Sequence, residues 1–203
     1  MTLRFAVLGD SIAYGQGASA PADTVAARLS ADLSAHGVPN EPRVLAVPGA
    51  QSRDLPAQAE RARAWPPDVA LIIIGANDLT RFVPPPQAVA HLTTAVRALR
   101  SVGAEVVVAP APDLSVVPWV PPEMRALVRA GSRVLHDAQT EAVRAEGGHV
   151  ADIGMTSAAG FAADPSLFSA DRFHPSSAGY AVIAAALAPA VRTAASYSRL
   201  GRR

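Results

Sequence analysis

The chain contains no cysteine among its 203 residues, which excludes disulfide bonds, thiolate metal ligands and a cysteine nucleophile. It also contains no lysine, because all 18 basic residues are arginine. The absence of lysine excludes a Walker A phosphate loop, a lysine Schiff base and lysine-assisted serine chemistry, and it argues against a phospho-accepting receiver domain. A genome biased towards GC-rich codons, which the many Ala, Arg and Pro residues suggest, accounts for the missing lysine without weakening these exclusions.

The chain also has a small net charge and no long apolar run. The formal net charge of +1 argues against a nucleic-acid partner. Apolar residues make up 50% of the chain, but no purely apolar stretch reaches 18 residues, so we expect no membrane span. The opening MTLRFAVLGD leads into a predicted strand without a signal leader. We therefore expect a cytoplasmic protein, with export of a longer precursor left open.

Short apolar runs alternate with longer segments of helical periodicity. The runs are continuous and rich in β-branched residues, which is typical of strands buried on both faces. Alternating strands and helices build a parallel sheet with right-handed crossovers, so we predict a three-layer α/β/α sandwich of five strands. The expected strands cover residues 3–9, 42–49, 68–75, 104–112 and 148–154, and the expected helices cover residues 24–37, 53–65, 85–103, 121–148 and 176–195.

The chain length suits a single domain with a substantial core. We place this domain over residues 1–195 and a frayed, solvated tail over residues 196–203. Three of the expected helices stop at a glycine, the residue that most readily adopts the left-handed conformation at a helix end: Gly37, Gly103 and Gly147. The sequence shows no internal repeat, linker or low-complexity segment.

Residues that can carry chemistry follow the expected strands at their carboxyl ends, where ligands bind in folds of this kind. Ser11 follows the first strand, Gly49 the second and Asn77 the third, while Asp171 and His174 precede the last helix. Each residue alone has an ordinary structural explanation as a turn residue, a helix cap or a surface histidine. Together they provide every part of a site for acyl transfer.

Acyl transfer requires a nucleophile, a base, a group that orients the base and donors for the oxyanion. Ser11 carries the hydroxyl, and His174 is the natural base because imidazole titrates near neutral pH. Asp171 stands three residues before the histidine, so one turn of chain brings both side chains to the same side. The backbone N–H groups of Ser11 and Gly49 and the Asn77 amide are the candidate oxyanion donors.

The other titratable residues are predicted to be alternative acids or to have structural functions. Asp152 and Asp164 are alternative acids that rank behind Asp171, and Asp10 and Asp78 are predicted to fix two turns by binding backbone N–H groups. No cluster of histidines and carboxylates has the spacing of metal ligands, so we expect no metal and no other cofactor. The remaining histidines are predicted to be structural: His36, His91, His136 and His149.

Four sequence blocks carry a resemblance to a known family. They are GDS (9–11), Gly49 within VPGAQS, GAND (75–78) and DRFH (171–174), and they follow one another in this order over most of the chain. In these blocks the chain resembles the SGNH hydrolases, also called GDSL esterases and lipases. One departure is minor, because Ile12 stands where the first block of the family often has leucine.

The resemblance implies a flavodoxin-like sheet with strand order 2-1-3-4-5. It also implies Ser11, His174 and Asp171 as a catalytic triad, with an oxyanion hole made by the Ser11 N–H, the Gly49 N–H and the Asn77 amide. We therefore expect a serine hydrolase whose substrate is a small ester or thioester of a short- to medium-chain acyl group. The oligomeric state is left open, and a monomer is compatible with the sequence.

Two proline-stiffened loops, after the third and fourth strands, are predicted to wall the acyl site. Arg81 and Arg172 flank the site and either hold an anionic leaving group, such as a phospholipid head or coenzyme A, or are solvated. Packing within the loops is the alternative role for the apolar candidates of the wall. These candidates are Phe82, Val83, Val117, Trp119, Val120 and Phe173.

Two other functions remain open. A carbohydrate O-acetyl esterase would use the same residues, although an aromatic content of 5% provides few platforms for sugars. A non-catalytic, flavodoxin-like module could bind a phosphate-bearing cofactor at the loop GDSIAYGQG. Such a module would have no use for His174 or Asp171.

Overall fold

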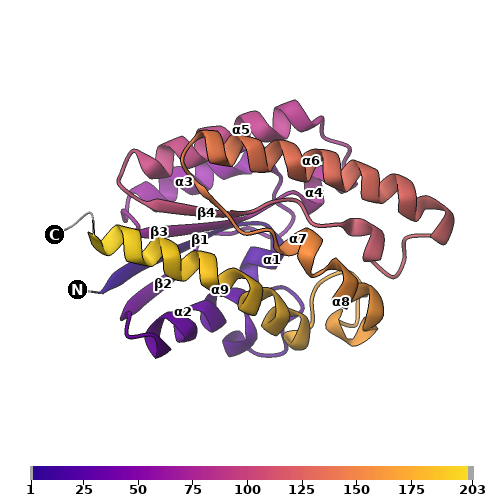
Figure 1. Cartoon of the computed structure of the whole chain (residues 1–203), viewed down its shortest axis with the longest axis horizontal. Helices are drawn as coiled ribbons and strands as arrows, with labels where there is room; N and C mark the ends of the chain where they lie inside the picture. The colour runs from indigo at the N-terminus through magenta and orange to yellow at the C-terminus, as the bar shows by residue number, and fades with distance from the viewer. Residues whose placement is uncertain (1, 201–203) are drawn as a thin grey trace.

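The computed structural model describes residues 2–200, apart from the side chains of residues 155 and 156. Five strands form one sheet in the order β2-β1-β3-β4-β5, and every neighbouring pair is parallel. Helices cover both faces of this sheet, which confirms the predicted three-layer sandwich (Figure 1). The strands are β1 (Leu3–Gly9), β2 (Asn40–Val44), β3 (Val69–Ile73), β4 (Glu105–Ala109) and β5 (His149–Val150).

Five long helices make the two outer layers. Helices α2 and α9 pack on one face of the sheet, and α3, α5 and α6 pack on the other (Figure 1). A parallel sheet covered on both faces buries its central strands completely. The long helices are α2 (Val25–Ala35), α3 (Leu55–Arg63), α5 (Pro85–Arg100), α6 (Arg125–Ala145) and α9 (Ser177–Leu200).

Strand β1 shows how both cores are built from one apolar run. Because successive side chains of a strand point to opposite faces, Phe5 and Val7 pack against the α2 and α9 layer. Ala6 and Leu8 pack in the opposite core, against α3 and α5. All four side chains are fully buried, which explains why the sequence of this strand is continuously apolar.

The strands all end at the same edge of the sheet, and short helices gather there (Figure 1). The start of β1 and the end of α9 lie at the opposite end of the molecule (Figure 1). None of these short helices was expected from the sequence, because a single turn has no apolar periodicity. The short helices are α1 (Ser11–Tyr14), α4 (Ala76–Thr80), α7 (Ile153–Thr156) and α8 (Ala158–Ala163), and five 3₁₀ turns accompany the helices, at Pro21–Asp23, Ser52–Asp54, Leu114–Val116, Pro122–Met124 and Pro165–Leu167.

The two outer strands depart from the prediction. Strand β2 covers Asn40–Val44 instead of 42–49, and most of it is exposed, because an edge strand has a neighbour on one side only. The Leu45 N–H still bonds to β1, so the apolar run continues the pairing beyond the strand. Strand β5 keeps only His149–Val150 of the predicted 148–154, because the chain turns into α7.

Helix α9 extends to Leu200, so the predicted tail from residue 196 is wrong for its first five positions. Ser198 is buried one turn beyond Ala195, which continues the helical spacing of the buried face. Residues 201–203 lie outside the described residues. The length of α9 and its mean hydropathy of 1.4 would suit a membrane span, but half of that stretch is buried within the protein. Packing on the sheet accounts for its apolar composition.

Candidate active site

Ser11 is positioned by a turn that only glycine can make. Gly9, the last residue of β1, has a φ of +130°, and a Cβ atom at this position would lie 1.9 Å from the Ile73 carbonyl oxygen. The chain then turns into α1, where the Asp10 carboxylate accepts a hydrogen bond of 2.9 Å from the Ile12 N–H. This cap places Ser11 at the first position of the helix, with 6% of its surface exposed.

Ser11, His174 and Asp171 form a continuous hydrogen-bonded series. Nε2 of His174 lies 3.0 Å from the Ser11 Oγ, and Nδ1 lies 2.6 Å from Oδ2 of Asp171. A carboxylate only accepts, so Nδ1 carries the proton and Nε2 is free to accept from the serine hydroxyl. The structure therefore brings together the three residues that the sequence predicts as nucleophile, base and orienting acid.

The Asp171 carboxylate is fixed by its own turn. Its Oδ1 accepts hydrogen bonds of 2.9 Å from the Phe173 and His174 N–H groups and one of 2.8 Å from the Ser169 hydroxyl. Partial burial raises the pKa of Asp171, but the bonds from the His174 side chain and from these donors outweigh it and hold the pKa well below its usual range. The carboxylate therefore stays ionised across the working pH range.

The three candidate oxyanion donors lie on α1, on α4 and on the loop between β2 and α3. Gly49 sits in this loop with a φ of +80°, a conformation that favours glycine. Asn77 Nδ2 donates to the carbonyl of Ala50, the next residue, at 3.0 Å, so α4 is tied to the Gly49 loop. A primary amide has two N–H bonds, which leaves one for another acceptor. Within residues 2–200, the backbone N–H groups of Ser11 and Gly49 have no hydrogen-bond acceptor.

Two buried carboxyl groups support these turns, as expected. Asp78 accepts from both the N–H and the hydroxyl of Ser52, which joins α4 to the Gly49 loop. Burial raises the pKa of Asp78. Burial also raises the pKa of Asp10 to about 7, against the hydrogen bond from Ile12 that lowers it, and the charge of Asp78 contributes to the increase. Oδ2 of Asp10 is buried without a hydrogen-bond partner among the described residues.

An apolar cavity opens beside α1, with Ile12, the residue after Ser11, in its lining. Its empty volume is about 630 Å³, including space open to solvent. Its walls come from α1, the loop after β4, the α7–α8 segment and the turn that holds His174. The side chains that define it include Ile12, Val116, Val117, Phe161, Phe168 and Phe173.

The cavity contains only part of the predicted acyl wall. Val117 and Phe173 line it, whereas Phe82, Val83 and Trp119 lie outside its lining. Phe82 is 90% exposed, Val83 packs near the start of α5, and the Trp119 ring contacts the Phe173 ring in a tilted arrangement at a centroid distance of 5.6 Å. The wall formed by α7 and α8 is not predicted from the sequence, because the apolar pattern up to residue 154 favours a strand.

The alternative acids serve other groups. Asp152 lies 3.1 Å from Nε2 of His136, a histidine on α6, and Asp164 caps a 3₁₀ turn through the Ser166 N–H. His149 pairs with Glu105 at the edge of the sheet. Neither alternative acid is bonded to His174, which supports the choice of Asp171 among the described carboxylates.

Comparison with known sequences assigns the chain to a family. The sequence profile of the GDSL-like lipase/acylhydrolase family matches residues 7–182. The chain belongs to this family. Among the proteins it resembles is a GDSL-like esterase of Mycobacterium tuberculosis, 38% identical over 192 residues, which are 93% of this chain. The chain spans only 61% of the length of that relative.

Several solved structures share the fold of this chain at low sequence identity. TesA superposes with a TM-score of 0.80 at 19% identity, over 94% of this chain and 99% of TesA. The psychrotrophic esterase EstA from Pseudoalteromonas sp. gives 0.74 at 18% identity, over 94% and 97%. The acetylxylan esterase Axe2 from Geobacillus stearothermophilus gives 0.71 at 20% identity, over 93% and 94%.

Proposed function

We propose that this protein is a serine hydrolase that cleaves carboxylic esters or thioesters of short- to medium-chain acyl groups through an acyl-enzyme. The observation that carries the proposal is the series from Ser11 Oγ through His174 to Asp171, with atom separations of 3.0 and 2.6 Å. Membership of the GDSL-like lipase/acylhydrolase family supports it.

In the first step, the Ser11 hydroxyl attacks the carbonyl carbon while His174 Nε2 accepts its proton. The carbonyl π electrons move to oxygen, and the oxyanion is held by the N–H groups of Ser11 and Gly49 and the free N–H of Asn77. The tetrahedral intermediate collapses, the bond to the leaving oxygen or sulfur breaks, and the imidazolium returns the proton to the leaving group. Asp171 stabilises the imidazolium and keeps its ring in place.

In the second step, water takes the place of the alcohol or thiol. His174 removes a proton from the water as its oxygen attacks the acyl carbon, and the same donors hold the second oxyanion. The proton then passes to Ser11 Oγ as the acyl-enzyme bond breaks. The products are the carboxylic acid and the free serine, so the two steps use one base and need no metal or cofactor.

The apolar cavity supports an acyl chain as the group on the carbonyl. It begins at Ile12, the residue after the nucleophile, and at Phe173 and Pro175, the residues on either side of the base. Its lining is almost entirely apolar, so a hydrocarbon chain would gain about 0.8 kcal/mol for each methylene buried there. A sugar in the same place would lose hydrogen bonds to water with few replacements.

A carbohydrate O-acetyl esterase is the alternative within the same chemistry. Axe2, an acetylxylan esterase, shares the fold, but at 20% identity this likeness extends to the fold alone. An acetyl group would leave the cavity of this protein unused. The chain-length profile of hydrolysis therefore separates the two functions.

The test is the hydrolysis of p-nitrophenyl esters from acetate to laurate. We expect a maximum between butyrate and octanoate for the unmodified protein, and loss of nearly all turnover in Ser11→Ala. Val116→Trp, which adds bulk to the cavity lining, should reduce octanoate turnover at least tenfold relative to acetate, whereas Val134→Trp on the exposed side of α6 should not. An acetate-only profile would favour the deacetylase, and equal turnover in Ser11→Ala would overturn the proposal.

A further inference from the structure

A buried side chain of α3 holds the turn that carries Ser11. Gln58 is 2% exposed, and its amide forms two hydrogen bonds to a single backbone residue, Gly9. Its Oε1 accepts from the Gly9 N–H at 2.7 Å, and its Nε2 donates to the Gly9 carbonyl at 2.9 Å. A primary amide carries a donor and an acceptor side by side, so it matches both polar groups of one residue.

Gln58 takes the place of a hydrogen bond between two strands. Strands β1 and β2 are parallel, and their register predicts two bonds at Gly9: its carbonyl accepts from the Val47 N–H, and its N–H donates to the Leu45 carbonyl. The first bond is present at 3.0 Å. The second is replaced, because the Gly9 N–H bonds to Gln58 and the Leu45 carbonyl accepts from the Arg61 side chain. Two side chains of α3 therefore bond where β1 and β2 would otherwise bond each other.

This junction at Gly9 lies next to two candidate oxyanion donors. Ser11 is two residues beyond Gly9, and Gly49 is two residues beyond Val47. The Gly9 carbonyl accepts from both Val47 and Gln58, so one oxygen atom joins the two chain segments to α3. The N–H groups of Ser11 and Gly49 must point to the same oxyanion. The relative placement of these two segments therefore decides how well the oxyanion is held.

The Gly49 loop has little packing of its own at this point. A Cβ atom on Gly49 would have no neighbour within 4 Å, and the residue has a φ of +80°. Asn77 and Asp78 tie the loop to α4 through the residues that follow Gly49. The junction at Gly9 ties it to β1 through the residues that precede it.

We propose that Gln58 is a positioning residue of the active site, which fixes the Gly9 backbone so that the N–H groups of Ser11 and Gly49 converge on the oxyanion. Gln58 acts through Gly9 and not by contact with the substrate. The inference rests on the proposed function, because that function assigns the two N–H groups to the oxyanion. A change at Gln58 should weaken binding of the transition state more than binding of the substrate, and so lower kcat while leaving KM nearly unchanged.

The first variant is Gln58→Leu, which keeps a side chain of similar size and removes both hydrogen bonds to Gly9. We expect kcat for p-nitrophenyl butyrate to fall about 100-fold, because a displacement of about 1 Å at a catalytic group costs that much. The KM value should stay within about threefold. Circular dichroism checks that the variant folds. An unchanged kcat in folded Gln58→Leu would overturn the proposal.

Gln139 provides the matched control. It is fully buried on α6, and its Oε1 accepts a hydrogen bond of 2.7 Å from the Ala111 N–H, which follows β4. None of the candidate oxyanion donors follows that strand. Gln139→Leu should lower the urea midpoint of unfolding, as Gln58→Leu does, but keep kcat within about threefold. Equal losses of kcat in the two variants would mean that loosening any strand end lowers activity, which would overturn a specific role for Gln58.

Gln58→Glu separates positioning from stability. A protonated carboxyl group has a donor and an acceptor and can keep both bonds to Gly9, whereas a carboxylate only accepts and loses the bond to the Gly9 carbonyl. Burial favours the protonated form. At pH 6 we expect a kcat within about fivefold of the unmodified protein, and the ratio of the two kcat values should fall at least tenfold towards pH 9. A ratio at pH 6 as low as that of Gln58→Leu would overturn the proposal.

The unmodified protein and Ser11→Ala are measured beside these variants, so that the two proposals can fail separately. Equal turnover in these two proteins, or none in either, would overturn the proposed function and this inference with it. Turnover that is lost in Ser11→Ala but complete in folded Gln58→Leu would overturn this inference alone. We expect turnover to be lost in Ser11→Ala, strongly reduced in Gln58→Leu and restored at pH 6 in Gln58→Glu.

Discussion

His174 and His136 both lie against carboxylates, but only His174 also faces a hydroxyl. His174 has Asp171 on Nδ1 and the Ser11 Oγ on Nε2, at 2.6 and 3.0 Å. His136, on α6, has Asp137 on Nδ1 and Asp152 on Nε2, both at 3.1 Å. His136 therefore has a carboxylate at the nitrogen that corresponds to the serine-facing nitrogen of His174.

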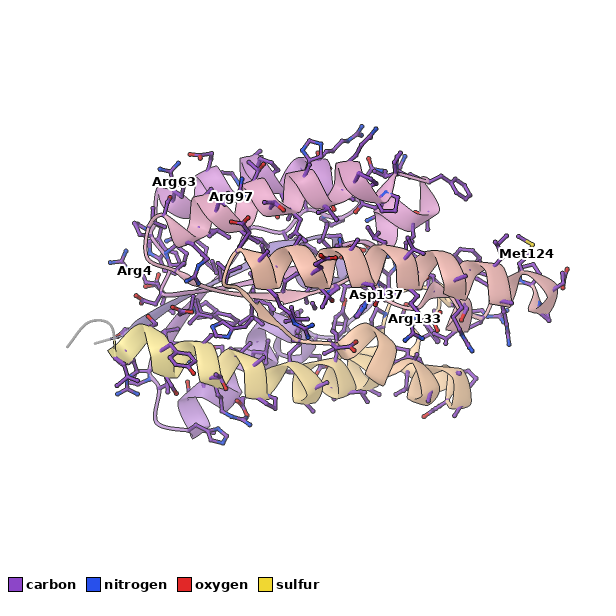
Figure 2. The ribbon with its side chains drawn as sticks, turned by 45° about the horizontal axis from the view of Figure 1, so that its top comes forward. Arg4, Arg63, Arg97, Met124, Arg133 and Asp137 are labelled. Carbon is purple, nitrogen blue, oxygen red and sulfur yellow. The ribbon has the colours of Figure 1, made fainter. Side chains whose placement is uncertain are left out.

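The partners decide what each ring can do. A neutral imidazole has one donor and one acceptor, which matches a carboxylate and a hydroxyl at His174. At His136 a carboxylate stands at each ring nitrogen, so neither nitrogen faces a hydroxyl that it could deprotonate. Asp137, one of the two carboxylates at His136, lies beside Arg133 on α6, well away from Met124 at the start of that helix (Figure 2). A histidine–carboxylate pair therefore marks a base only where the second nitrogen meets a nucleophile.

The largest contrast is expected between the two histidines. His174→Gln should reduce kcat/KM for p-nitrophenyl butyrate by about 10⁴-fold or more, because the base is lost. His136→Gln should keep kcat/KM within a few fold and lower the free energy of unfolding by about 1–3 kcal/mol, because its contacts with Asp137 and Asp152 are lost. Steady-state kinetics and urea unfolding of both variants measure these effects. Comparable losses of activity would contradict the distinction.

The two candidate acids, Asp171 and Asp152, should also differ in their effect on kcat, with the larger loss at Asp171. Asp171→Asn should lower kcat by about 10²- to 10⁴-fold, because an amide cannot hold the Nδ1–H tautomer or stabilise the imidazolium. Asp152→Asn should change kcat by less than threefold. The measurement is kcat on the same ester, with circular dichroism to check that both variants fold. A larger effect at Asp152 would return the role of the acid to the alternative candidate.

The oxyanion donors set the next contrast. Asn77→Ala should lower kcat about 100- to 1000-fold, which corresponds to about 3–4 kcal/mol. Thr80→Ala, on the same short helix, should leave kcat within twofold. Because Asn77 also binds the Ala50 carbonyl, the unfolding midpoint of both variants is measured beside kcat. Full activity in a folded Asn77→Ala would remove this residue from the oxyanion hole.

The smallest expected effect is the pH dependence of stability caused by Asp10, the residue before Ser11. Burial raises the pKa of Asp10 to about 7, so between about pH 4 and pH 7 the folded protein keeps a proton that the unfolded chain releases. Stability therefore falls as the pH rises through this window and levels off above it. Asp10→Asn has no proton to lose. From pH 5 to pH 8, we expect its free energy of unfolding to improve relative to the unmodified protein by about 2–3 kcal/mol.

Urea unfolding at both pH values measures this difference. Asp164→Asn, at an exposed carboxylate, should follow the unmodified protein at both values, since that group is ionised in the folded and unfolded states above pH 5. Parallel pH curves for Asp10→Asn and the unmodified protein would show that Asp10 is ionised in the folded state.

The sequence predicted the parts of this protein that depend on local patterns. Central strands such as β1 and β3 are continuously apolar because both faces are buried, and helices α2, α5 and α6 end at left-handed glycines, as expected. The apolar run predicted as the second strand was expected to be buried, but β2 is mostly exposed because it lies at the edge of the sheet with β1 as its one neighbour. This edge position depends on the order of the strands, which the residues of β2 do not indicate. Ser11, Gly49 and Asn77 were found because each follows a strand, whereas Asp171 and His174 were found by their spacing before the last helix.

Side-chain partners across the fold could not be predicted in this way. Nothing near Asp152 in the sequence indicates that its carboxylate meets His136 on α6. Phe161 lies on the short helix α8 and Phe168 follows a 3₁₀ turn, and neither segment is long enough to show an apolar periodicity. Their place in the cavity therefore depends on the packing of α7 and α8. Phe82 was expected to wall the cavity, but the end of α4 turns it into solvent. Such contacts join residues far apart in sequence.

The most direct test of the central claim is covalent labelling of the nucleophile. The protein is treated with a fluorophosphonate, digested, and the modified residue is located by mass spectrometry. We predict a single phosphonylated serine, Ser11, formed rapidly in the unmodified protein and in His136→Gln, and at least a hundredfold more slowly in His174→Gln. Labelling at another serine, or equal rates in the two histidine variants, would contradict the assignment of Ser11 and His174 as nucleophile and base.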